Sequence, residues 1–259
     1  MKNKPRILIT NDDGVHAPGI RYLWEALHEI ADLTIVAPQT EQSATGLSIT
    51  LRSPLRLEKL NWSNGIVAWS VNGTPSDCVK LGLNIVFNEK PDLIVSGINR
   101  GTNAGRNALY SGTVAAAIEG VLHGIPAIAF SCHDYWDTDY TTANKHIPSI
   151  VEHVLKHPLP NGTLLNVNFP SKELEQIRGY KMTRQGMAYW TEDLAERFHP
   201  AEKHTYYWLG AKLAEFNEIE DCDIAWLKKG YVTAVPIHVN ELTDHQHLES
   251  RKNVFEALF

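Results

Sequence analysis

Two adjacent carboxylates, Asp12 and Asp13, follow a short apolar run near the start of the chain and precede Gly14. The apolar run, Ile7 to Ile9, is typical of a buried strand. Neighbouring carboxylates repel each other unless a proton or a cation lies between them. Because open α/β sheets keep their ligand crevices at the carboxyl ends of strands, the pair predicts a bound cation. The alternative is a turn held by Asx hydrogen bonds, with no ligand.

Oxygen ligands also follow the second and third core strands that the sequence predicts. The loop of residues 38–48 contains Ser43, and the loop that begins at Ser96 contains Asn99. In a doubly wound sheet these loops meet the first one at a single edge. Two charged and two neutral oxygens, without a soft ligand, suit magnesium, manganese or calcium better than zinc. The predicted metal ligands are Asp12, Asp13, Ser43 and Asn99.

A second chemical signal is the segment Tyr110-Ser111-Gly112-Thr113. Ser111 is a typical helix N-cap, which leaves the amides of Gly112 and Thr113 facing the crevice. Helix N-termini bind phosphate through free N–H groups and the positive end of the helix dipole. The alternative is simple capping without a ligand. The glycine-rich stretch of residues 97–105 would let the backbone approach such a ligand closely.

Histidines near the end of the chain form the third candidate group. His238 follows a late apolar run, and His245 and His247 come shortly after it. A histidine that reached the crevice could move protons near neutral pH. The alternative is an exposed histidine at the start of a helix.

The elements that must position these groups alternate between strand and helix patterns. This alternation predicts an α/β fold, with a doubly wound, mostly parallel sheet and helices on both faces. Strands are expected at 6–10, 33–37, 66–71, 92–96, 127–131 and 164–169, and helices at 19–30, 76–87, 111–123 and 143–155, with Ser76 capping the second of these helices. The pattern divides the chain into a core of residues 1–175 and a strand-rich C-terminal extension of residues 176–259. Clustered aromatics such as Trp190 and Trp208 suggest an arm that packs on a partner.

Composition and absent motifs exclude several classes of protein. The formal net charge of −6 gives no basic surface for nucleic-acid polymers. Three widely spaced cysteines predict neither disulfides nor a zinc site, and they fit the reducing cytoplasm. The start of the chain does not resemble a signal peptide, and no apolar stretch approaches the ~20 residues that a membrane span needs. A P-loop, a dinucleotide-binding G-x-G-x-x-G after the first strand and a G-x-S-x-G serine elbow are all missing.

Taken together, these motifs resemble the survival protein SurE family of metal-dependent 5′/3′-nucleotidases. The resemblance covers roughly residues 6–131 in the family's order, and its combination of motifs is highly specific. The matching segments are Thr10-Asn11-Asp12-Asp13-Gly14, Glu41-Gln42-Ser43, Asn72-Gly73-Thr74-Pro75 with Asp77-Cys78, Ser96-Gly97-Ile98-Asn99 with Gly101, Asn103 and Gly105, and Tyr110-Ser111-Gly112-Thr113.

The resemblance implies a Rossmann-like core and a C-terminal region that helps to build a homodimer or homotetramer. It implies one divalent metal ion per subunit, magnesium or manganese, on the ligands proposed above. It also implies that Asn103, Ser111, Gly112 and Thr113 surround the phosphate. Towards the end of the chain Glu241 stands where the family has aspartate, and the family's histidine falls on His245, with His247 close by. Ala44 and Leu47 replace the glycine and histidine often found in the family's second loop.

The expected activity is hydrolysis of nucleoside monophosphates to nucleoside and phosphate, with Asp12, Asp13 and His245 as catalytic residues. Either a water attacks phosphorus while His245 handles a proton, or Asp12 acts as a covalent nucleophile. Two other functions stay open at this stage. One is a phosphatase acting on other small phosphates, including short polyphosphates; the other is a non-catalytic nucleotide sensor.

Overall fold

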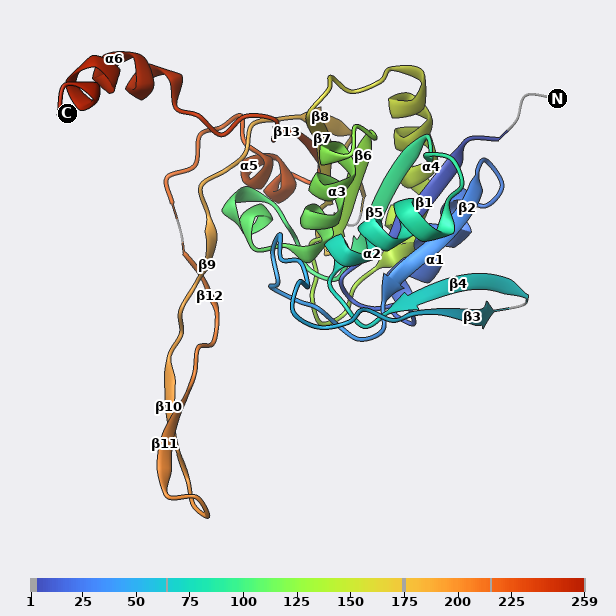
Figure 1. Cartoon of the computed structure of the whole chain (residues 1–259), viewed down its shortest axis with the longest axis horizontal. Helices are drawn as coiled ribbons and strands as arrows, with labels where there is room; N and C mark the ends of the chain where they lie inside the picture. Colours follow the sequence, from blue (N-terminus) through green and yellow to red (C-terminus); the bar gives the residue numbers. More distant parts are fainter. Residues whose placement is uncertain (1–3, 64, 174–175, 215, 259) are drawn as a thin grey trace.

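A nine-stranded sheet forms the centre of the computed structural model, which describes residues 4–63, 65–173, 176–214 and 216–258 (Figure 1). Across the sheet the order is β3 (Leu57–Ser63), β4 (Ile66–Val71), β2 (Asp32–Pro38), β1 (Arg6–Thr10), β5 (Leu93–Asn99), β6 (Ala127–Cys132), β7 (Thr163–Phe169), β13 (Val232–His238) and β8 (Tyr180–Met182). In this order, neighbouring strands from β4 to β7 are all parallel, whereas β3 pairs antiparallel with β4 and β13 pairs antiparallel with β7. The predicted mostly parallel α/β fold is confirmed.

Helices cover both faces of this sheet, as the alternating side chains of β1 require. Ile7 and Ile9 belong to the apolar cluster that includes α1 (Pro18–Leu27) and α4 (Tyr140–Lys156). Leu8 points the other way, into the cluster that includes α2 (Pro75–Leu81) and α3 (Gly112–Leu122). Because both faces are buried, the three consecutive residues Ile7, Leu8 and Ile9 are all apolar.

The predicted start of the second helix, with Ser76 as its N-cap, is wrong. Thr74, and not Ser76, is its N-cap: the Thr74 hydroxyl accepts from the amide of Asp77, whose carboxylate accepts from the amide of Thr74. Pro75 then occupies the first helical position, which favours this start. α2 ends at Leu81, and a π-helical turn over Gly82–Val86 forms the rest of the predicted helix.

The C-terminal part contributes two strands to the sheet and forms a separate ribbon outside it. β13 and β8 extend the sheet, while a long two-stranded ribbon projects away from it (Figure 1). The ribbon pairs β9 (Tyr189–Thr191) with β12 (Lys212–Ala214), and β10 (Ala195–His199) with β11 (His204–Trp208). α5 (Asp223–Lys228) lies beside the sheet, and α6 (His245–Glu256) ends the described chain without a buried residue. Within the described residues, none of the helices is long and apolar enough to cross a membrane.

Candidate active site

Asp12 lies at the carboxyl end of β1, directly against the first turn of α3. Its side chain is 5% exposed, and its Oδ1 accepts a hydrogen bond from the hydroxyl of Thr113. A Cβ atom at Gly112 would lie 2.7 Å from the Cβ of Asp12 and 2.9 Å from its Oδ2. Glycine at position 112 therefore lets the helix N-terminus approach the carboxylate.

The Asx turn that was the alternative explanation belongs to Asn11. Its side-chain amide donates to the Gly14 carbonyl at 2.9 Å, and its Oδ1 accepts from the Gly14 amide at 3.2 Å. The left-handed backbone of Gly14, with φ of +106°, completes the turn. The turn and the acidic pair are thus separate features, since Asn11 makes these turn bonds and Asp12 bonds to Thr113 instead.

Two buried carboxylates lie side by side here, and the positive charge of Arg100 only partly offsets that of Asp13. Burial raises the pKa of Asp12, against the hydrogen bond from Thr113, which lowers it. Burial and then the charge of Asp12 raise the pKa of Asp13 to about 7. A cation beside the pair would reverse both shifts, because opposite charge favours the ionised form. In the described residues no group of three or more His, Cys, Asp or Glu is placed to hold a metal, so neutral oxygens must complete a site here.

The loop after β2 brings Ser43 to this edge of the sheet. The amide of Gln42 donates to the Asp12 carbonyl at 2.7 Å, and the amide of Gly46 donates to the Tyr110 carbonyl at 3.0 Å. The hydroxyl of Ser43 is exposed and donates to Glu41 Oε1 at 2.5 Å. Ser43 therefore lies on a loop that contacts both Asp12 and the residue before the Ser111 cap.

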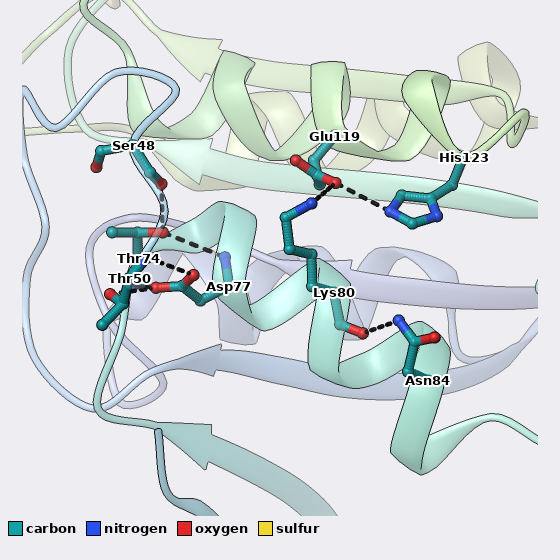
Figure 2. Close-up of polar contacts among 8 residues, drawn as sticks. All are labelled: Ser48, Thr50, Thr74, Asp77, Lys80, Asn84, Glu119 and His123. Atoms are coloured by element: carbon teal, nitrogen blue, oxygen red, sulfur yellow. Dashed lines mark hydrogen bonds and ion pairs between the residues drawn. The ribbon is translucent and has the colours of Figure 1, made fainter. Parts of the chain in front are cut away.

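A buried carboxylate, Asp77, ties the far part of the same loop to α2 (Figure 2). Its Oδ1 accepts from the Thr50 amide at 3.0 Å, and its Oδ2 accepts from the Thr50 hydroxyl at 2.7 Å. The Thr74 hydroxyl adds a bond to the Ser48 carbonyl at 2.8 Å. These bonds hold the irregular loop after β2 in place against α2.

Figure 2 also shows how α2 is joined to α3. Glu119 is buried in the middle of α3 and lies 2.6 Å from Lys80 Nζ and 3.0 Å from His123 Nε2. Because Lys80 belongs to α2, this pair links the helix that supports the loop to the helix whose N-terminus faces Asp12.

The loop after β5 brings Asn99 close to Asp13. The Asn99 amide nitrogen donates to the Gly101 carbonyl at 2.7 Å and to the Arg100 carbonyl at 3.3 Å, so its Oδ1 is available as a ligand. The backbone amide of Arg100 donates to Asp13 Oδ2 at 3.3 Å. The structure thus gathers the predicted oxygens of three loops at one edge of the sheet.

The predicted phosphate residues lie on the α3 side of this edge. Ser111 caps α3 by accepting from the Val114 amide at 3.1 Å. The amides of Gly112 and Thr113 are the first of the helix and have no intrahelical acceptor. The Thr113 amide faces the Asp12 carboxylate and lowers its pKa. The Asn103 side chain is buried, and its Nδ2 donates to Ser131 Oγ at 2.7 Å.

The structure does not bring His245 or His247 to this cluster within one chain. His245 begins α6, its side chain is 62% exposed, and its Nε2 lies 3.1 Å from Glu241 Oε1. α6 projects away from the sheet, on the side opposite β3 and β4 (Figure 1). Any role for His245 at Asp12 therefore requires an arrangement beyond the single chain.

Several supporting residues were not predicted from the sequence. Asn168 accepts from the Asn103 amide at 2.8 Å, and Asn166 donates to the Asn103 carbonyl at 2.9 Å. Two asparagines at alternate positions of an otherwise apolar strand are a signal that one face meets a polar site. Asp223 of α5 accepts from the Gly105 amide at 2.8 Å, a contact with no comparable sequence signal.

Fold and site together define a Rossmann-like α/β protein whose acidic pair and helix N-terminus converge at the carboxyl edge of a parallel sheet. The sequence profile described as "Survival protein SurE" matches residues 7–192. The chain belongs to the SurE family.

Individual relatives extend this match over the whole chain. A protein named 5′-nucleotidase SurE from Protochlamydia amoebophila is 58% identical over 258 residues and is covered to 99%, as is this chain. Another of that name from Flavobacterium psychrophilum is 44% identical, with 97% of this chain and 98% of the relative covered. The crystal structure of the SurE protein from Aquifex aeolicus superposes with a TM-score of 0.83 at 37% identity, covering 96% of this chain and 99% of that one.

Proposed function

We propose that this protein is a 5′-nucleotidase that hydrolyses nucleoside monophosphates to nucleosides and phosphate with the help of a bound divalent metal ion. The observation that carries the proposal is the contact between Asp12 and the N-terminus of α3. It supports a cation bound at the carboxylate directly beside an anion bound at the helix N-terminus. The relatives named 5′-nucleotidase SurE support the same activity.

The residues present fit a hard divalent cation such as Mg²⁺ or Mn²⁺. Asp12 Oδ2, Asp13, the Ser43 hydroxyl and the Asn99 carbonyl oxygen are the proposed ligands, and all are oxygens. The raised pKa of both carboxylates supports this assignment, because burial outweighs the hydrogen bonds to Asp12 and the positive charge of Arg100 near Asp13. A cation between the pair would stabilise both ionised forms. When bound, the ion supplies positive charge to a phosphoryl oxygen.

The phosphate is held by groups at the start of α3. The amides of Gly112 and Thr113 donate to its oxygens, and the Ser111 hydroxyl and the second N–H of Asn103 complete the set. These donors are fixed before substrate arrives, since α3 is capped by Ser111 and anchored by Glu119. Fixed donors stabilise the charge that develops on the phosphoryl oxygens without costly rearrangement.

A water attacks phosphorus, and His245 handles the proton of that water or of the leaving alkoxide, with His247 as the competing candidate. Because α6 is remote from Asp12 in its own chain, we propose that His245 acts in a homodimer or homotetramer. Exposed apolar side chains on α6 and on the ribbon support such an assembly. They are Leu248, Val254, Phe255, Phe198, Tyr207 and Trp208.

The proposed location is the cytoplasm. Cys78, Cys132 and Cys222 are all free and buried, as expected of a protein from a reducing compartment.

Phosphate release from AMP tests the proposed function. We expect turnover with Mg²⁺ or Mn²⁺, none after treatment with a chelator, and recovery when the metal is restored. A nucleotide sensor would bind AMP without releasing phosphate, and a general phosphatase would prefer sugar phosphates or short polyphosphates in a substrate panel. Trapping a phosphorylated Asp12 would replace direct attack by water with the covalent mechanism.

A further inference from the structure

Two exposed aromatic residues, Tyr135 and Trp136, lie on the loop that follows β6. The loop is held at both ends. Asp134 accepts from the Ser171 hydroxyl and from the Lys172 amide, both at 2.8 Å. At the other end Asp139 caps α4. The aromatic pair is therefore carried on a fixed loop, although Trp136 is 93% exposed.

The pair packs on Arg100 rather than on the apolar core. The guanidinium carbon of Arg100 lies 4.6 Å from the centroid of the Tyr135 ring. The rings of Tyr135 and Trp136 meet edge to face, with centroids 5.0 Å apart. A Cβ atom on Gly101 would lie 3.2 Å from Tyr135 Cδ2, so the loop after β5 and the loop after β6 are in close contact.

Arg100 joins this aromatic pair to the rim of the active site. Its backbone amide donates to Asp13, and its guanidinium lies 3.3 Å from both carboxylate oxygens of Glu41. Glu41 in turn accepts from the Ser43 hydroxyl. Through Arg100 and Glu41, the aromatic surface is thus continuous with the residues proposed to hold the metal.

We propose that Arg100, Tyr135 and Trp136 form a platform for the nucleobase, with the base stacked on the Trp136 indole. The inference rests on the proposed function, because a nucleotide whose phosphate lies at α3 must project its base out of the crevice. Bases stack on aromatic side chains with little dependence on their identity, so the platform favours nucleotides over sugar phosphates without selecting one base. Arg100 holds the platform in place through its contact with Tyr135 and its ion pair with Glu41.

A competing surface lies on the α3 side of the crevice, where Leu109 and Tyr110 are exposed. Tyr110 directly precedes the Ser111 cap, but the structure gives it no aromatic or cationic partner among the described residues. Tyr110→Ala therefore serves as the matched control for Trp136→Ala.

The test compares kcat/KM for AMP with kcat/KM for ribose 5-phosphate, which lacks a base. Stacking of one base predicts that the ratio falls about tenfold in Trp136→Ala, mainly through KM for AMP, and is restored in Trp136→Phe. Tyr110→Ala should keep the wild-type ratio. A wild-type ratio in Trp136→Ala, or a fall in Tyr110→Ala instead, would overturn the platform. If no protein hydrolyses either substrate, the proposed function fails, and adenosine affinity measured by calorimetry for wild type and Trp136→Ala decides the platform separately.

Discussion

The carboxyl edge of the sheet differs from the C-terminal ribbon and α6 in how far its side chains are buried and bonded within the chain. At the sheet edge, buried polar groups such as Asp12 and Asn103 find partners within the chain. On the ribbon and α6, Trp208 and Phe255 remain more than half exposed. One chain is therefore enough to bury the acidic cluster, whereas large apolar side chains of the ribbon and α6 are left exposed, as is typical of surfaces that bind a partner.

The largest effect is expected at the acidic pair. Asp12→Asn removes one of two charges from the proposed metal site, and we expect kcat/KM for AMP to fall about a thousandfold, with weaker metal binding. Steady-state kinetics at limiting Mn²⁺ measure this. Asp92→Asn is the control, because Asp92 lies at the opposite edge of the sheet, where it accepts from the Arg6 amide. Wild-type turnover in Asp12→Asn would remove the pair from catalysis.

A smaller but distinct effect is expected at α6. His245→Ala should lower kcat about a hundredfold with little change in metal affinity, because it removes a proton carrier and no ligand. His247→Ala tests the competing candidate two residues away: a fall in kcat there and not in His245→Ala would make His247 the proton carrier.

Mixing the two inactive proteins sharpens this prediction. Assemblies of His245→Ala and Asp12→Asn subunits should regain activity if α6 serves a neighbouring crevice, since some sites then combine an intact Asp12 with an intact His245. Failure of the mixture to regain activity, with subunit exchange verified by mass, would contradict action between subunits.

The free energy of unfolding should depend on the link between α2 and α3 and not on exposed residues of the ribbon. Glu119→Gln breaks the link between α2 and α3, and we expect it to cost about 2 kcal/mol of unfolding free energy because Lys80 loses a buried partner. Glu196→Gln on exposed β10 is the control and should change the free energy by less than about 0.5 kcal/mol. Chemical denaturation measures both, and equal effects would show that the two regions are not energetically different.

The smallest effect concerns pH. The pKa of Asp13 is raised to about 7 in the folded protein from its ordinary value of 3.8, so the folded state binds its proton more tightly than the unfolded state. Metal-free protein should therefore lose stability as pH rises from about 4 to about 7. Added Mn²⁺ should raise the melting temperature more at pH 8 than at pH 5.5. A metal effect that is equal at both pH values would argue against binding at Asp13.

The sequence predicted the approximate bounds of six strands of the sheet, β1, β2, β4, β5, β6 and β7, but not those of β3, β8 and β13. The strand predicted at 127–131, for example, is a short apolar run. Asp12, Ser43 and Asn99 were grouped because the loops after parallel strands share one edge of the sheet. The start of α2 was mispredicted because two residues that can cap a helix, Thr74 and Ser76, are close in sequence. Asp77 completes a capping box with Thr74, and Pro75 favours the same start.

Contacts between distant loops could not be predicted in the same way. The stacking of Arg100 on Tyr135 depends on side-chain directions that no periodicity encodes. The position of α6 could not be predicted either, because the helix buries no residue in its own chain.

The most direct test of the account is a crystal soaked in Mn²⁺ and examined by anomalous scattering. The account predicts one strong peak per chain, within coordination distance of Asp12, Asp13, Ser43 and Asn99. An empty crevice, or a peak held by other residues, would contradict it.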